Sequence, residues 1–452
     1  MELTDASDFE TQYAYLSERE NIFQWLGNRE QQFNDLEQLE KVVEKQADDT
    51  RRADLALRQS SFALVTGNYD DALEKVGLAL EYAKLANDPQ VEARAYHRHG
   101  RTLWEQGRSL EAKEILNQAL NAAIAAGNSQ LEAESLYDLA MAYRMQAQFE
   151  HSLNMLQKAL EAYKSLADEQ GIVRCYNLFG VIDYEMGNIL ESEQYYLRAL
   201  DLCHSIGWRY AETHILFNIA TTRFEFGDYG ESESYLKDAL TLSEETGNQQ
   251  LQAMSLDTMG LITYYQGDPE TAITFYERAE TILRPLDQKR DLGFVLTHSG
   301  YATIVVGDLD KAETILNQAL KFRRELGATA LAIDAMAGLA WVAKDQGRIE
   351  DARKITSEIF SYIVENDTSG IEMPIQVYLI CYQVLTEVAK VYPPIHAQAV
   401  EVLEAGHSLL DKRVEQLPDQ EMQRRFLQNV PYNRDLQAAW VAENSSQPTH
   451  LD

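Results

Sequence analysis

Residues 177–200 read NLFGVIDYEMGNILESEQYYLRAL, and this stretch decides the fold. Gly180 lies seven positions before Gly187, and Ser192 follows five positions after it. Glycine ends a helix in the left-handed conformation at little steric cost. Asn188 is suited to begin the next helix, because its side chain accepts hydrogen bonds from free backbone amides. The stretch therefore predicts two helices joined by a tight turn.

The same three features recur every forty residues. The turn glycine is found at Gly67, Gly107, Gly187, Gly227, Gly267, Gly307 and Gly347, with Ala147 in the one remaining place. A small residue precedes each turn by seven positions, and Ala or Ser follows each by five. Between turns the apolar spacing is helical, as in Leu153, Leu156, Leu160 and Tyr163. Because a single hairpin cannot bury its apolar face, we expect an all-α array of eight stacked hairpins.

The residues at these recurring positions resemble the tetratricopeptide repeat, and residues 177–200 match its Leu-Gly, Gly-Asp-Tyr and Ala-Leu pattern best. The family's usual repeat has about 34 residues. The longer version here is similar to the repeats of bacterial regulators of the MalT and signal-transduction ATPase type. Residues 418–440, PDQEMQRRFLQNVPYNRDLQAAW, resemble the arginine-rich tail of those regulators. The resemblance implies a right-handed α-α superhelix of about eight to nine helical hairpins with a C-terminal helical cap.

The domain organisation follows from the repeat pattern and its loss at both ends. In the cap, Met422 with Phe426 and Leu436 with Trp440 are spaced to cover the last hairpin. We predict N-terminal capping helices at 1–51, eight tetratricopeptide-like repeats at 52–371, a degenerate ninth helix pair at 372–417, the helical cap at 418–443, and a disordered tail at 444–452.

Composition excludes several functions. The chain has 40 basic and 72 acidic residues, a formal net charge of −32, so nucleic acid and anionic membranes are disfavoured as partners. Cys175, Cys203 and Cys381 are widely spaced and indicate neither a disulfide framework nor a zinc site. No apolar run is long enough to cross a membrane, and the first residues do not form a secretory signal. We expect a cytoplasmic, bacterial protein.

No pattern of catalytic residues is present. The sequence lacks a phosphate-binding loop, an HExxH zinc motif, a GxSxG elbow, an EF-hand loop and the kinase signatures. Carboxylates on an array of helices are mostly solvated or paired with residues one turn away. We therefore predict that the protein is not an enzyme and holds no metal or cofactor.

In tetratricopeptide repeats the first helix of each pair lines a concave groove. Relative to the small residue before each turn, the family's groove positions lie six and three before it and one, four and five after it. The residues at these positions that we predict to bind a partner are Arg94, His97, Arg101, Trp104, Tyr137, Arg144, Arg174, Asn177, Tyr184, Phe217, Phe224, Tyr264, Tyr301 and Trp341.

Four arginines and recurrent aromatic residues distinguish this surface from the acidic average of the chain. Arginine presents a planar fork that suits carboxylate or phosphate, and aromatic residues dominate binding hot spots. The groove is therefore predicted to hold an acidic or aromatic peptide segment, or a small anionic molecule with a flat ring. The alternative is structural: the aromatics pack between repeats, and the arginines pair with Glu134, Glu185 or Glu225.

Three functional classes use such an array. The first is the sensor or scaffold part of a bacterial signalling regulator, which binds a protein or peptide in the groove. The second is a free-standing scaffold for multiprotein assembly, and an exposed terminal hairpin at 8–50 would allow self-association. The third is the class of peptide-regulated response-regulator phosphatases. That class needs an N-terminal three-helix bundle, for which the first fifty residues are too short and too repeat-like.

Overall fold

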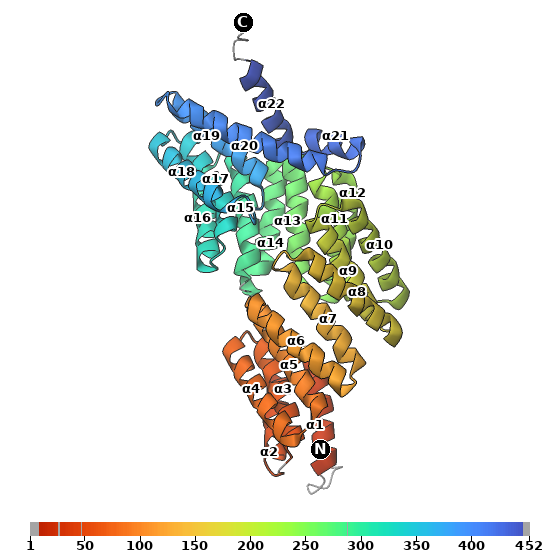
Figure 1. Cartoon of the computed structure of the whole chain (residues 1–452). Helices are drawn as coiled ribbons and strands as arrows, with labels where there is room; N and C mark the ends of the chain where they lie inside the picture. Colours follow the sequence, from red (N-terminus) through yellow and green to blue (C-terminus); the bar gives the residue numbers. More distant parts are fainter. Residues whose placement is uncertain (1–8, 26–27, 47, 287, 446–452) are drawn as a thin grey trace. The chain divides into compact units, whose positions relative to one another are not determined.

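The computed structural model describes residues 9–25, 28–46, 48–286 and 288–445 (Figure 1). These described residues form α-helices, one short 3-10 helix and turns, so the predicted all-α class is confirmed. The chain divides into two compact units, Met1–Ile182 (unit 1) and Asp183–Asp452 (unit 2). The predicted tail at 444–452 starts inside the last helix, which continues to Ser445, and its remaining residues lie outside the described part, as do residues 1–8.

Unit 1 is a stack of helix hairpins in which each helix from α1 to α7 packs against the next along the chain. Its helices are α1 (Phe9–Trp25), α2 (Arg29–Val43), α3 (Asp49–Val65), α4 (Tyr69–Ala86), α5 (Pro89–Glu105), α6 (Ser109–Ala126), α7 (Ser129–Arg144), α8 (Phe149–Leu166) and most of α9 (Glu169–Glu185).

Unit 2 continues the hairpin pattern and ends in four helices that leave the forty-residue register. Its elements are α10 (Ile189–Ile206), α11 (Arg209–Glu225), α12 (Tyr229–Thr246), α13 (Gln249–Tyr265), α14 (Pro269–Leu283), η1 (Arg284–Leu286), α15 (Lys289–Val306), α16 (Leu309–Glu325), α17 (Thr329–Asp345), α18 (Ile349–Asn366), α19 (Pro374–Ala389), α20 (Ile395–Glu415), α21 (Gln420–Gln428) and α22 (Pro431–Ser445).

The turns within the eight repeats have the predicted left-handed residue, but the predicted cap at Asn188 is wrong: its side-chain amide donates to Asp183 and makes no cap hydrogen bond. Gly67 has φ +77°, and the side chain of the following Asn68 accepts a hydrogen bond from the backbone amide of Asp71. Ala147, which replaces glycine in the register, adopts φ 53°. The turns between hairpins form a second left-handed register that we did not predict; it comprises Asn87, Gly127, Ala167, Gly207, Gly247 and Gly327. Both turn types therefore end a helix by the same backbone geometry.

The small residues near each turn bring the paired helices together. Ser60 Oγ donates a hydrogen bond to the backbone oxygen of Ala72 across the hairpin, at 2.9 Å. At Gly100 an added Cβ would lie 2.6 Å from the side chain of Leu116. This close approach explains why the column seven positions before the turn contains only small residues in the eight repeats.

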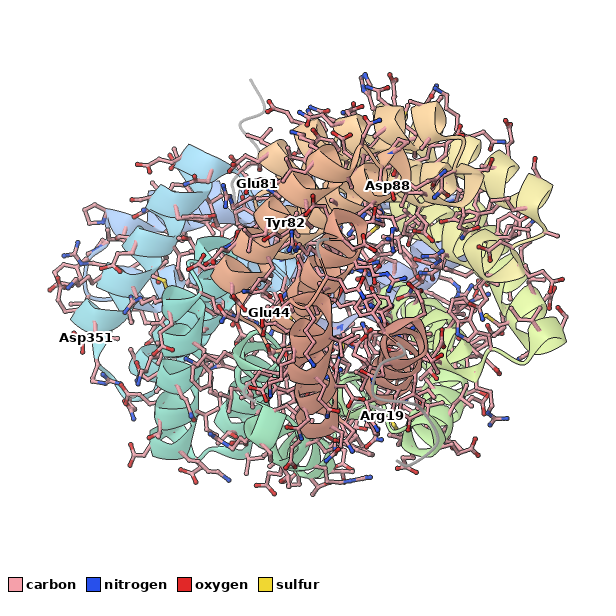
Figure 2. The ribbon with its side chains drawn as sticks, turned by 90° about the horizontal axis from the view of Figure 1, so that it is seen from below. Arg19, Glu44, Glu81, Tyr82, Asp88 and Asp351 are labelled. Atoms are coloured by element: carbon pink, nitrogen blue, oxygen red, sulfur yellow. The ribbon has the colours of Figure 1, made fainter. Side chains whose placement is uncertain are left out.

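The first hairpin, α1 with α2, replaces that small-residue contact by a buried polar pair. Gln32 Nε2 donates to Glu20 Oε1 at 2.7 Å, and both side chains are fully buried. Arg58 of α3 pairs with the second oxygen of Glu20 at 2.7 Å. Arg19 of α1, labelled in Figure 2, pairs with the buried Asp35 of α2. Hydrogen bonds and charge pairing compensate for burying these groups.

The C-terminal helices do more than cover the last hairpin. Trp440 of α22 stacks on His407 of α20, and Leu436 is fully buried, as predicted for a cap. Phe426 of α21, however, packs against Phe226 at the end of α11, with ring centroids 6.1 Å apart. The prediction that Met422 and Phe426 also cover the last hairpin is therefore corrected: α21 lies against the turn between α11 and α12.

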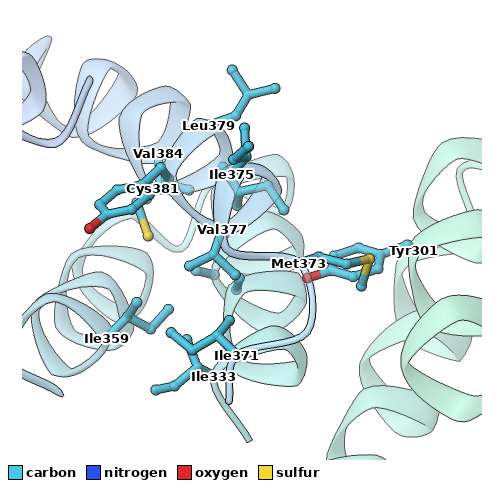
Figure 3. Packing of buried hydrophobic residues seen from close by; sticks show 14 of the residues in the cluster. Tyr301, Ile333, Ile359, Ile371, Met373, Ile375, Val377, Leu379, Cys381 and Val384 are labelled. Carbon is cyan, nitrogen blue, oxygen red and sulfur yellow. The ribbon is translucent and has the colours of Figure 1, made fainter. Parts of the chain in front are cut away.

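A short connection between α18 and α19 is anchored in the core of unit 2. Ile371 and Met373 are buried in the same apolar cluster as Ile333 of α17 (Figure 3). The carboxylate of Asp334 accepts hydrogen bonds from the backbone amides of Glu372 and Met373, each at 3.0 Å. The connection thus carries Glu372 to the first helices of the earlier hairpins.

Candidate functional site

Unit 1 has a polar pocket of about 260 Å³ on the first helices of its hairpins. Predicted residues Arg94 and His97 of α5 line it. The other lining residues are Asn21, Gln24, Asp54, Leu57, Arg58, Ser61, Arg98, Leu131 and Glu134. Figure 2 shows the side chains as sticks, with Tyr82 marking α4 of unit 1.

Three arginines line this pocket together with two carboxylates, and one of the arginines, Arg58, also pairs with Glu20. Asp54 is shared by two guanidinium groups, Arg58 at 2.8 Å and Arg94 at 3.1 Å. Arg98 has no carboxylate of the described residues within ion-pair distance. Burial and the neighbouring charge of Arg101 lower the pKa of Arg98, and the carboxylates of Glu105, Asp138 and Glu134 oppose this shift. An anionic group entering the pocket would find an unpaired guanidinium there.

His97 is nearly buried and faces Asp138 of the next hairpin, with 2.9 Å between Nε2 and Oδ2. Burial alone would raise the pKa of Asp138, but the interaction with His97 holds it below its usual range. His97 therefore lines the pocket while its ring is held by this chain's own carboxylate.

The other predicted residues of unit 1 lie outside the pocket. Arg101 pairs with Glu105 at 3.4 Å rather than with the acids we expected. Arg174 lies between the rings of Tyr137 and Tyr163, at 5.3 and 5.4 Å from their centroids. Trp104 packs on the core near Leu116, and Arg144 and Asn177 are partly buried on α7 and α9. Some of these side chains therefore pack against neighbouring residues, and others are exposed to solvent.

Unit 2 has a larger pocket of about 450 Å³, in which the first helices of three successive hairpins meet. Eight of its lining residues stand at the predicted groove positions: Phe217, Thr221, Phe224 and Glu225 of α11, Met254, Asp257 and Leu261 of α13, and Phe294 of α15. Groove positions of three helices therefore line one concavity in this unit.

A buried charged cluster closes one side of this pocket. His298 Nδ1 lies 2.9 Å from Asp257, and His298 Nε2 lies 3.2 Å from Glu372. Burial alone would lower the pKa of His298, but the two carboxylates raise it to about 10. The imidazole is therefore held as a cation between two anions at neutral pH.

The histidine–carboxylate pairs of the two units share one register. His97 and Asp257 lie three positions before the small residue of their repeats, and Asp138 and His298 lie two positions before it in the following repeats. The order of acid and base is reversed between the pairs. Residues two positions before the small residue therefore also reach the inner face, which we did not predict. The forty-residue spacing of Arg58 and Arg98 is the sequence pattern that indicates it.

Four predicted aromatics of unit 2 lie elsewhere. Tyr301 is fully buried and donates to the backbone oxygen of Asp334 at 2.6 Å, so its side chain packs inside the unit. Tyr184 lines a pocket of about 260 Å³ with Arg413. Tyr264 and Trp341 line another, of about 400 Å³, beside the N-terminal ends of α19 and α22.

The sequence matches the family model described as tetratricopeptide repeat at residues 91–165 and 209–284. Both matched ranges consist of the hairpins described above. These two ranges are tetratricopeptide repeats. They contain Arg94 and Arg98 in unit 1 and most of the larger pocket in unit 2.

Several solved structures have a similar fold. A Rap protein in complex with Competence and Sporulation Factor is 16% identical, with TM-score 0.56, and the match covers 80% of this chain and 99% of that one. The apo quorum sensor NprR from B. thuringiensis is 16% identical, with TM-score 0.56, over 79% of this chain and 100% of that one.

A signal transduction ATPase with a tetratricopeptide repeat sensor, from Pyrococcus horikoshii, is 15% identical with TM-score 0.54. The match covers 82% of this chain and 56% of that one. At these identities the likeness establishes the fold alone. No curated protein matches the sequence.

The described residues contain neither a candidate membrane-spanning helix nor a candidate metal site. None of the helices of the described part is long and apolar enough to cross a membrane. Within the same ranges, no group of three or more histidine, cysteine, aspartate and glutamate side chains is placed to hold a metal ion.

Proposed function

We propose that this protein is a non-catalytic binding module that holds a segment of a partner protein on the inner faces of its hairpins. The observation that carries the proposal is the convergence of groove positions from three successive hairpins on one pocket in unit 2. The Rap protein named above is in complex with Competence and Sporulation Factor, which supports a role in binding a partner.

The unit 1 pocket, taken by itself, is proposed to bind an acidic side chain of a partner. Arg98 lacks a carboxylate partner in the described part of the chain, and Asp54 is divided between Arg58 and Arg94. A carboxylate can accept two parallel hydrogen bonds from one guanidinium, which gives charge-assisted contacts of well-defined geometry. The chain is acidic overall, so a pocket lined by three arginines differs from the rest of its surface.

The experiment is fluorescence anisotropy with a labelled peptide rich in aspartate and glutamate, compared with the same peptide carrying asparagine and glutamine. We expect Arg98→Gln to weaken binding of the acidic peptide about tenfold, the loss of one charge-assisted hydrogen bond. Arg108→Gln is the matched control, because Arg108 pairs with Glu111 on the outer side of a turn and lines none of these pockets. Equal binding by both variants, or equal binding of the two peptides, contradicts the assignment.

The finer proposal is that the module is the sensor or scaffold part of a bacterial signalling regulator. The sensor-bearing ATPase of similar fold supports the first role. A sensor binds one peptide per chain, whereas a free-standing scaffold holds two partners together. Light scattering of the complex measures the stoichiometry, and a ternary assembly on one chain would favour the scaffold.

A further inference from the structure

Unit 2 has a second cavity that the inner-face proposal does not use. It has a volume of about 400 Å³ and lies between the C-terminal ends of α13 and α17 and the N-terminal ends of α19 and α22. The C-terminal tail forms one wall, because Tyr432 and Arg434 of α22 line the cavity. Its size is within the range of small-molecule sites.

Four aromatic rings contribute to its walls. Tyr264, Tyr265, Trp341 and Tyr432 all line the cavity. Tyr265 and Tyr432 are in edge contact with centroids 5.7 Å apart, and Trp341 Nε1 donates to Asp345 at 2.9 Å. These contacts hold the rings in place before any ligand arrives. Fixed aromatic faces favour stacking on a flat ring.

The side-chain amide of Gln376 is a buried polar group of this cavity. Gln376 is only 6% exposed, and its Oε1 has no hydrogen-bond partner among the described residues. A buried, unsatisfied amide is costly, so each such group in a native structure calls for an explanation. A ligand with a hydrogen-bond donor beside an acceptor would satisfy the amide, since an amide offers both.

Charge at this cavity is balanced. Arg434 and Asp435 are its only charged lining residues in the described part of the chain, and they pair with each other at 2.9 Å. An ionic ligand therefore gains little here, in contrast to the arginine pocket of unit 1.

We propose that this cavity binds a small, uncharged, planar heteroaromatic molecule whose ring carries an N–H donor next to a carbonyl or ring-nitrogen acceptor, as a nucleobase does. The ring stacks on Trp341 and the tyrosines, and its polar edge bonds to Gln376. This site goes beyond the proposed peptide binding: it lies outside both inner-face pockets and selects neutral ligands instead of acidic ones.

The test uses uracil and adenine as probes, with 1,3-dimethyluracil as the control ligand that lacks N–H donors. Saturation-transfer NMR and calorimetry report binding. We expect uracil or adenine to bind the wild-type chain, dimethyluracil to bind at least tenfold more weakly, and Gln376→Leu to lose at least tenfold in affinity for the same probe. Gln416→Leu, an exposed glutamine outside the cavity, is the matched control and should bind as wild type does.

Failure of both probes to bind, or equal binding to Gln376→Leu and wild type, overturns the proposal. If Gln376→Leu does not fold, Tyr264→Phe removes one cavity hydroxyl with little change of shape, and Trp341→Leu removes a stacking surface. One of these must weaken probe binding at least threefold for the site to stand. The acidic-peptide experiment measures the contribution of Arg98 in unit 1, whereas the probe experiment measures binding to this cavity of unit 2. Either proposal can therefore fail without the other.

Discussion

The guanidinium of Arg425 lies 2.5 Å from the carboxylate of Asp228, a residue 197 positions earlier in the chain. The same turn receives two further bonds from the tail: Asn429 Nδ2 donates to the backbone oxygen of Gly227, and Tyr229 donates to the backbone oxygen of Asn429. The tail therefore clasps the middle of unit 2. The end of a repeat stack ordinarily contacts only the neighbouring hairpin, whereas this tail also contacts a turn far away in the sequence.

We predict that Arg425→Ala lowers the free energy of unfolding of unit 2 by about 1–2 kcal/mol, because it removes a partly buried charge-assisted bond. Urea unfolding measures the change. Arg424→Ala is the control within the same motif, since Arg424 is exposed and pairs with Glu421 of its own helix. An equal loss in both variants would show that the clasp adds nothing.

Replacing two glycines of unit 1 by alanine should change the free energy of unfolding in opposite directions. Gly100→Ala places a Cβ 2.6 Å from Leu116, and we expect a loss of about 1–3 kcal/mol from overpacking. Gly77→Ala on the exposed side of α4 meets nothing within 4 Å, and we expect a gain of about 0.5–1 kcal/mol from helix propensity. Thermal or urea unfolding of the two variants checks both signs. Two variants that change stability in the same direction would contradict this packing.

The turns and hairpins could be predicted from the sequence because their chemistry is local. Each forty-residue period repeats a left-handed turn residue and a close helix contact, and the structure has both at Gly67 and Gly100. The clasp between Arg425 and Asp228 could not be predicted, since nothing in residues 227–229 marks that turn as the one the tail contacts. The buried Glu20–Gln32 pair was missed because two long polar residues replace the small ones of the pattern.

The candidate site was predicted in part. The groove rule led to the unit 2 pocket through Phe217 and Phe224, since periodic positions on stacked helices share one face. It did not distinguish rings that line a cavity from rings that pack, and Tyr301 is fully buried. Glu372 and Gln376 reach their sites from segments outside the repeat, so no periodicity could place them.

The buried histidine makes a prediction about pH. His298 titrates near 6.5 in the unfolded chain, whereas the folded protein raises its pKa to about 10. A raised folded pKa stabilises the protein below pH 6.5, and this contribution is lost as pH rises towards 10. Stability should therefore fall over that interval with a slope of up to about 1.4 kcal/mol per pH unit from this group.

Urea unfolding at several pH values measures the slope in wild type and in His298→Gln, which should lack this component. His204→Gln, an exposed histidine beside Glu212, is the control and should keep the wild-type slope. Histidine NMR gives a direct check: the His298 ring signals should not titrate between pH 6 and 8. A titration midpoint near 6.5 would mean that Asp257 and Glu372 do not hold the proton.

The last prediction concerns Asp334, which anchors the connection before α19 through the amides of Glu372 and Met373. Asp334→Ala leaves two buried donors without their acceptor, so we expect a loss of about 2–4 kcal/mol, somewhat more than one unsatisfied group costs. Asp334→Asn keeps one acceptor oxygen and should lose less. The exposed Asp351, labelled in Figure 2, pairs with Arg348 at 3.5 Å, and Asp351→Ala should change stability by less than about 0.5 kcal/mol. Hydrogen exchange at the amides of residues 372 and 373 gives the local readout: both should exchange faster in Asp334→Ala, and unchanged protection there would show that another acceptor holds the connection.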